Sequence, residues 1–379
     1  MIGLALEGGG AKGSYQVGAY KALKELGYKF DYIVGTSIGA INGVIFAQHD
    51  EEIAERVWSD IKYSTVVDAD DKRIQRFINE DLTFSNLKEK FELIKEVVSE
   101  GGFDTTPFKE LLEQYVDEEK LRRSDIRFGL VTVDLSNMKP IEVFIEDMEP
   151  GSLKQYLYAS SNLPIFRQEP IDGRYLIDGG FYSNNPVKMI EDKCDEVINI
   201  LLYPNRLLHL TSAGKNVKTI MPREKLADIM NFNSVDARYG IELGYHDTYK
   251  YFQNLLGDKY YIIDPGEEYS LNYIAKLYEY FKEGEPAYRS LRQFLELWVS
   301  DYIKKNKLNK DLNYSEVIAA MLEKLAICLG VERFKIYDIN ELAKVIFEDE
   351  KYPDYKYTFY QESKIVDIIN SKNILGEGD

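Results

Sequence analysis

One serine near the start of the chain has the neighbours of an activated nucleophile. Ser37 stands between Gly35 and Gly39, at the junction of a predicted strand over 32–35 and a predicted buried helix over 38–48. A Gly-x-Ser-x-Gly sequence in that context forms a nucleophile elbow, because the flanking glycines remove side chains from a strained turn that projects the hydroxyl. The spacing predicts a nucleophile at Ser37, and the alternative is a buried serine in a close-packed turn.

A serine nucleophile needs a base to accept its proton. The chain contains three histidines, His49, His209 and His246. His49 follows Ser37 by twelve residues, which is about 18 Å along a continuous helix. The other two histidines stand in no recognisable site context. We therefore expect the base to be a carboxylate.

Asp178 is the candidate carboxylate. It follows a hairpin-like piece over 173–177, at the end of a short apolar strand, and precedes Gly179 and Gly180. The two glycines allow another backbone to approach closely, although an Asp-Gly pair is also common in hairpin turns. Because the elbow serine has no histidine in a suitable context, the sequence favours Asp178 as its partner.

A glycine-rich loop precedes both of these motifs and reads Gly8-Gly9-Gly10-Ala11-Lys12-Gly13. It joins a predicted strand over 3–7 to a predicted helix over 15–26. Backbone amides in such a loop, with a helix N-terminus behind them, bind an anion or a developing oxyanion. The loop also matches the dinucleotide-binding pattern Gly-x-Gly-x-x-Gly, and a tight turn without a ligand is a third interpretation. It does not match the P-loop, because Ser14 stands where that motif has lysine.

The elements that must position these motifs follow a strand–helix–strand–helix order over the first fifty residues. That order predicts a parallel sheet with helices on its faces. Apolar stretches predict further strands over 127–134, 141–145, 196–203 and 259–263. Helical spacing predicts helices over 84–100, from Thr106-Pro107 onward, and over 152–158.

The character of the chain changes after about residue 264. Apolar residues recur at helical spacing, which predicts helices over 288–302, 315–329, 338–347 and 362–370. We therefore predict a catalytic domain over 1–264 and a helical C-terminal domain of unknown role over 265–379. The aromatic stripes of these helices are typical of a packed core.

Composition limits the partners. The chain has 379 residues and a net charge of -17, which disfavours nucleic acid and allows peripheral membrane contact only through a local patch. Two cysteines are too few for a disulfide framework, and no ligand cluster predicts a metal. The stretch from Tyr32 to Gln48 falls short of a spanning helix. With no targeting segment visible, we expect a cytoplasmic protein without a transmembrane segment.

Together, the motifs resemble the patatin-like phospholipases, a family of lipid acyl hydrolases. The resemblance spans residues 3 to about 205, continues weakly through 239–245, and rests on four blocks in the family's order: Gly8 to Gly13, Gly35 to Gly39, Ala159 to Pro164, and Asp178 to Pro186. It implies a three-layer α/β/α fold with a mostly parallel central sheet, followed here by the helical region. It also implies a Ser37–Asp178 dyad and an oxyanion hole formed by the glycine loop, including Gly8, Gly9, Gly10, Lys12 and Gly13. No cofactor is expected.

The implied mechanism begins with attack of Ser37 on an ester carbonyl, with Asp178 as the base. An unperturbed aspartate has a pKa of about 3.9, and burial would raise that pKa toward a useful range. Two alternatives remain. A nucleotide-binding Rossmann protein would use the glycine loop, but its acidic residue should end the second strand, whereas Asp31 precedes it. A non-catalytic interaction protein leaves Ser37 and Asp178 unexplained. The acyl substrate, its positional specificity and the oligomeric state stay open.

Overall fold

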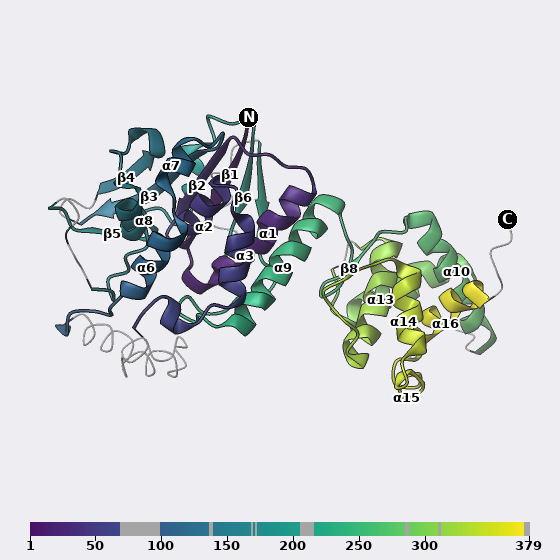
Figure 1. The fold of residues 1–379 in the computed structure, drawn as a ribbon. Helices are drawn as coiled ribbons and strands as arrows, with labels where there is room; N and C mark the ends of the chain where they lie inside the picture. The colour runs from purple at the N-terminus through teal and green to yellow at the C-terminus, as the bar shows by residue number, and fades with distance from the viewer. Residues whose placement is uncertain are drawn as a thin grey trace. The chain divides into compact units, whose positions relative to one another are not determined.

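The computed structural model describes residues 1–68, 99–135, 139–167, 170, 173–204, 216–284, 288–309 and 312–374. The chain divides into two compact units, Met1–Thr248 and Tyr249–Asp379 (Figure 1). The first unit contains all the motifs identified above. The division into functional domains at residue 264 stays a prediction.

A single mixed sheet organises the described part of the first unit. Its seven strands follow the order β4-β3-β2-β1-β6-β7, with β5 paired to β3. The pairs β1–β2, β1–β6, β2–β3 and β6–β7 are parallel, whereas β4 and β5 each run antiparallel to β3. The bounds are β1 Ile2–Leu6, β2 Tyr32–Thr36, β3 Arg127–Asp134, β4 Lys139–Phe144, β5 Leu176–Asp178, β6 Glu196–Ile200 and β7 Val217–Ile220.

The central strands are covered on both faces, and the sequence shows why. Strand β2 is buried along its whole length, and β1 and β3 are buried except at their first residues. Strands that lose both faces to helices have nearly continuous apolar runs instead of an alternating pattern. The predicted strands over 3–7, 32–35 and 127–134 therefore coincide with β1, β2 and β3, and the predicted three-layer α/β/α class is confirmed.

The helices that the sequence predicts within the described part of the first unit, α1, α2, α6 and α8, begin close to where the sequence signals place them. Pro107 occupies the first turn of α6, where a missing amide hydrogen costs nothing. The bounds are α1 Ser14–Glu25, α2 Ile38–Ala47, α3 Glu51–Ser59, α6 Thr106–Tyr115, α7 Glu118–Arg122, α8 Leu153–Ser160 and α9 Ser234–Gln253. The helix predicted over 84–100 lies almost entirely outside the described residues.

Two sequence predictions need correction or addition. The strand predicted over 259–263 is the shorter β8, Tyr261–Ile262, and it pairs with β9, Ile336–Tyr337, in a separate two-stranded sheet instead of the central sheet. The predictions also missed β7, the helices α3, α7 and α9 of the first unit, and the long helix over Glu267–Gly284 in the second. Helix α9 interleaves glycine, charged and aromatic residues, which obscures its apolar face.

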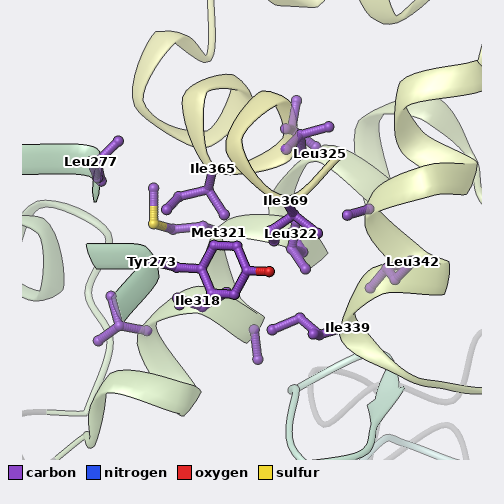
Figure 2. Close-up of a cluster of buried hydrophobic side chains, with 14 of the residues drawn as sticks. Tyr273, Leu277, Ile318, Met321, Leu322, Leu325, Ile339, Leu342, Ile365 and Ile369 are labelled. Atoms are coloured by element: carbon purple, nitrogen blue, oxygen red, sulfur yellow. The ribbon is translucent and has the colours of Figure 1, made fainter. Parts of the chain in front are cut away.

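The second unit is mainly helical and is built around α13, Tyr314–Leu329. Asn313 and Glu316 form a capping box at its start, and Gly330 ends it with φ 74°. Ile318, Met321, Leu322 and Leu325 of α13 are fully buried in the apolar cluster of Figure 2. The other helices are α10 Glu267–Gly284, α11 Leu291–Phe294, α12 Ser300–Lys305, α14 Ile339–Glu348, α15 Tyr352–Tyr355 and α16 Tyr360–Ile374.

The predicted helices over 315–329, 338–347 and 362–370 match α13, α14 and α16. The helical face predicted over 288–302 is interrupted by a π-helical turn over Leu295–Val299. Among the described helices, none is both long enough and apolar enough to cross a bilayer.

Candidate active site

Ser37 occupies a strained turn between β2 and α2. Its backbone has φ 55° and ψ -125°, a combination that side-chain-bearing residues rarely adopt. A Cβ on Gly35 would lie 2.2 Å from the carbonyl carbon of Gly39, and a Cβ on Gly39 would lie 2.3 Å from the carbonyl oxygen of Leu6. Both positions therefore require glycine, as the elbow motif predicts.

The structure brings Ser37 and Asp178 together. The hydroxyl of Ser37 donates a hydrogen bond to Oδ2 of Asp178 at 2.5 Å. Asp178 ends β5, where it is paired with Thr132 of β3. Because β3 lies beside β2, the elbow and the end of β5 meet at one region of the sheet. Oδ1 of Asp178 accepts a second hydrogen bond from the amide of Gly180 at 2.7 Å.

Burial changes the proton affinity of Asp178. The side chain is only 3% exposed, and this desolvation raises the pKa of Asp178 from 3.8 to about 6, against the opposing effects of the Ser37 hydroxyl and the Gly180 amide. A carboxylate with that pKa is ionised at neutral pH and is a stronger base than an exposed aspartate.

The glycine loop forms a short 3₁₀ turn over Gly10–Gly13. The amide of Gly8 donates to the carbonyl of Asn184 at 2.9 Å, and the amide of Ala11 donates to the carbonyl of Ile229 at 2.8 Å. Within the described part of the chain, the amides of Gly9 and Gly10 have no acceptor. Gly8 is therefore engaged in holding the loop, and Gly9 and Gly10 are the donors left for a ligand.

Lys12 is buried rather than solvated. Its side chain is 7% exposed, and its ammonium lies 3.7 Å from the centroid of the Tyr203 ring. A cation over an aromatic face is attracted to the ring quadrupole. Gly13 is required by packing, because a Cβ there would lie 2.5 Å from Cγ1 of Ile38. These two residues therefore contribute packing to the loop.

Sequence reasoning did not single out Glu7, and it quoted Asn184 only as part of a family block. The side-chain amide of Asn184 donates to the carbonyl of Gly8 at 2.9 Å and to Oε1 of Glu7 at 3.2 Å. Glu7 is fully buried, and its Oε2 accepts from the amide of Leu202 at 2.6 Å. The sequence feature that could have indicated Glu7 is its position as a carboxylate at the end of a predicted apolar strand.

An apolar cleft opens beside Ser37. Its empty volume is about 670 Å³, including space open to solvent, and none of the described residues that line it is charged. Trp58 is held in the wall, because its Nε1 donates to Oδ1 of Asn42 at 2.9 Å. The apolar walls include Ile38, Ile41, Trp58, Phe108, Leu163 and Phe232. Such a surface suits an apolar ligand next to the hydroxyl.

The histidines have other partners. Nε2 of His49 lies 2.8 Å from Oδ1 of Asp125 at the surface, and Nδ1 of His246 lies 2.8 Å from the carbonyl of Glu242 within α9. His209 lies outside the described residues. Among the described residues, no three His, Cys, Asp or Glu side chains are grouped so as to hold a metal ion.

The Rossmann alternative fails on the position of its acidic residue. Asp31 precedes β2, and its Oδ2 accepts from the amide of Ile2 at 2.7 Å. A ribose-binding carboxylate should instead stand at the carboxyl end of the second strand. That end is occupied by the elbow, so the glycine loop faces Ser37 and Asn184 in place of a nucleotide-binding residue.

Comparison with known proteins places these motifs in a family. The model of the patatin-like phospholipases matches residues 4–190. This region belongs to the patatin-like phospholipase family. The patatin-like region is 30% identical over 200 residues to patatin-like phospholipase domain-containing protein 7 of Rattus norvegicus, and this alignment covers 52% of the chain. Over 198 residues it is 57% identical to lysophospholipase nte1 of Aspergillus terreus, which again covers 52% of the chain.

The chain spans only a small part of these longer relatives, 13% of the rat protein and 11% of the fungal one. Among solved structures, VipD from Legionella pneumophila is similar with a TM-score of 0.43 and 13% identity, over 97% of this chain and 88% of that chain.

Proposed function

We propose that the first unit, Met1–Thr248, hydrolyses carboxylic esters of lipids, with Ser37 as nucleophile and Asp178 as base. We call this unit the patatin-like unit. The observation that carries the proposal is the 2.5 Å hydrogen bond from the Ser37 hydroxyl to a buried carboxylate beside an apolar cleft. The family match and the names of the relatives support a lipid ester as the substrate.

The reaction proceeds through an acyl-enzyme. Oγ of Ser37 attacks the ester carbonyl while its proton moves to Asp178, and the amides of Gly9 and Gly10 donate to the oxyanion. Asp178 then gives the proton to the departing alcohol as the carbon–oxygen bond breaks. Water next attacks the acyl carbon, and its proton returns through Asp178 to Ser37 as the fatty acid leaves.

The substrate class follows from the cleft and the relatives. Apolar walls, with no charged side chain among the described lining residues, favour an acyl chain in the cleft and a charged head group outside it. One relative is named a lysophospholipase, so we take a single-chain lysophospholipid as the first substrate to test. Contact with a membrane surface would be peripheral.

The test measures fatty acid released from lysophosphatidylcholine micelles and from a soluble p-nitrophenyl ester. We expect turnover by the wild type and a loss of at least about 10³-fold in Ser37→Ala, because the nucleophile is removed. Ser270→Ala is the matched control, since Ser270 is buried, bonds to Ser315 at 2.9 Å and lies in the second unit. A folded wild type that cleaves neither ester, or a Ser37→Ala variant that cleaves both normally, contradicts the proposal.

A further inference from the structure

The segment that ends α8 contacts both members of the dyad. The amide of Ser37 donates to Oγ of Ser160 at 3.0 Å, and the amide of Asp178 donates to the carbonyl of Asn162 at 3.0 Å. Ser160 is fully buried and donates its own proton to the carbonyl of Val131 at 2.6 Å. Its hydroxyl therefore connects the elbow to β3, the strand that carries β5.

The carbonyl of Val131 also borders the turn after Asp178. A Cβ on Gly179 would lie 2.3 Å from that oxygen. The Ser160 hydroxyl and the backbone of Gly179 thus lie against the same carbonyl, one on the Ser37 side and one on the Asp178 side. The Ser160 hydroxyl therefore bridges the amide of Ser37 and a carbonyl that also borders the turn after Asp178.

The backbone of Ser37 depends on such restraint. Its φ of 55° and ψ of -125° lie in a sparsely populated region, where a residue is strained and stays only if its surroundings hold it. Without Ser160, the buried amide of Ser37 would lose its acceptor. The turn would then relax toward an ordinary conformation and move the Ser37 hydroxyl away from Asp178.

We propose that Ser160 is a positioning residue that keeps the Ser37 hydroxyl within hydrogen-bonding distance of Asp178. This inference rests on the proposed ester hydrolysis, because the position of Ser37 matters only if Ser37 reacts. Ser160 does not touch the substrate and acts only through the amide of Ser37 and the carbonyl of Val131.

The experiment compares Ser160→Ala with the wild type on the p-nitrophenyl ester and on a fluorophosphonate. We expect kcat and the rate of fluorophosphonate labelling to fall by about 10²-fold, the effect of misplacing a reacting atom by roughly 1 Å, with KM changed less than about threefold. Ser160→Thr keeps the hydroxyl and should recover most of the rate. Ser160→Cys keeps a side chain of similar volume but replaces the hydroxyl with a weak acceptor. We therefore expect it to be slow as well, and it serves as the test variant if Ser160→Ala does not fold.

Ser270→Ala controls for the loss of a buried hydroxyl, since it should melt at a lower temperature without losing kcat. An active wild type combined with Ser160→Ala or Ser160→Cys of normal kcat overturns the positioning role alone. Equal loss of kcat in Ser160→Ala and in a folded Ser160→Thr also overturns it, because the hydroxyl would then be irrelevant. A wild type that neither turns over ester nor reacts with fluorophosphonate overturns the proposed function, and the positioning role with it.

Discussion

Each unit of this protein buries more than one carboxylate, and one from each unit, Glu323 and Asp178, can be compared by their partners. Glu323 lies in the second unit, Tyr249–Asp379, which we call the helical unit. It is 6% exposed and accepts from three consecutive backbone amides, those of residues 258–260, at 3.0, 2.5 and 2.7 Å. Asp178 in the patatin-like unit is 3% exposed and accepts from one backbone amide and the hydroxyl of Ser37. The anion of Glu323 is thus held by fixed dipoles, whereas that of Asp178 faces a proton that can move.

Backbone strain differs between the two units in the same way. Lys307 has φ 55°, as Ser37 does, but it follows Asn306, the C-cap of α12, at the position where a left-handed residue commonly terminates a helix. Ser37 instead precedes a helix and lies at the end of a buried strand. The comparison indicates that buried charge and positive φ are ordinary by themselves, and that their convergence on one hydroxyl distinguishes the candidate site.

The largest effect should come from exchanging each carboxylate for its amide. We expect Asp178→Asn to lower kcat by about 10²–10⁴-fold, because the base is lost, and to fold at least as stably at pH 8, because a buried charge is removed. Glu323→Gln should instead lower stability and leave turnover unchanged. The new NH2 group of the glutamine would face the backbone N–H of Asp258, and two donors without an acceptor between them cost about 1–3 kcal/mol of stability. Ester kinetics and urea unfolding of both variants check this contrast, and similar behaviour of the two would break it.

Glycine substitutions come next in size. A Cβ on Gly39 meets backbone atoms of Leu6 at 2.3 and 2.8 Å, so Gly39→Ala should destabilise the protein by roughly 3 kcal/mol or more. Gly330 has φ 74° and open space around it, so Gly330→Ala should cost only about 1 kcal/mol, the penalty of a left-handed alanine. Thermal unfolding of both variants measures the difference, and equal losses of stability would show that the elbow is not tightly packed.

The pH dependence of stability and of kcat/KM should distinguish Asp178 from carboxyl groups of ordinary pKa. Its pKa is raised from 3.8 to about 6, so the folded protein takes up a proton near pH 6 that the unfolded chain takes up only near pH 4. As the pH falls through this window, the wild type should gain roughly 3 kcal/mol of stability relative to Asp178→Asn. Its kcat/KM should fall over the same range, because a protonated Asp178 cannot accept the Ser37 proton. Unfolding and kinetics from pH 4 to 8 test both trends, and a stability difference that does not vary with pH would contradict them.

The smallest expected effect concerns the aromatic core of the helical unit. Trp298 stacks on Phe294 with ring centroids 4.8 Å apart, and its buried Nε1 has no hydrogen-bond partner in the described part of the chain. In Trp298→Phe the lost apolar area opposes the relief of that unpaired donor. We expect stability to change by less than about 1 kcal/mol in urea unfolding and turnover to stay unchanged. A loss of turnover would link this core to the site.

The central strands, several helices and the pairing of Ser37 with Asp178 were accessible from the sequence because they depend on local patterns. A strand followed by Gly-x-Ser-x-Gly predicts the elbow, and the absence of a histidine in a suitable context directs attention to Asp178. The pairing of β5 with β3 was not accessible, since three residues carry little signal. β8 appeared in the sequence as a short apolar stretch, but nothing local indicated β9 as its partner.

The supporting contacts were beyond sequence reasoning for a different reason. Ser160 and Asn184 act across more than a hundred residues of chain, on Ser37 and Gly8. Serine and asparagine are common in turns, so their type alone does not indicate a long-range partner. Similarly, the sequence suggested Gly8 as an oxyanion donor, and only the bond from its amide to Asn184 assigns it to holding the loop.

The central claim is that Ser37 is an activated nucleophile, and covalent labelling tests it most directly. The wild type and Ser37→Ala would be incubated with a fluorophosphonate at pH 8, and intact mass and peptide mapping would then locate any adduct. We predict one adduct per wild-type chain, on the peptide that contains Ser37, and none on the variant. A folded wild type that stays unlabelled, or that carries its adduct on another residue, would contradict the account.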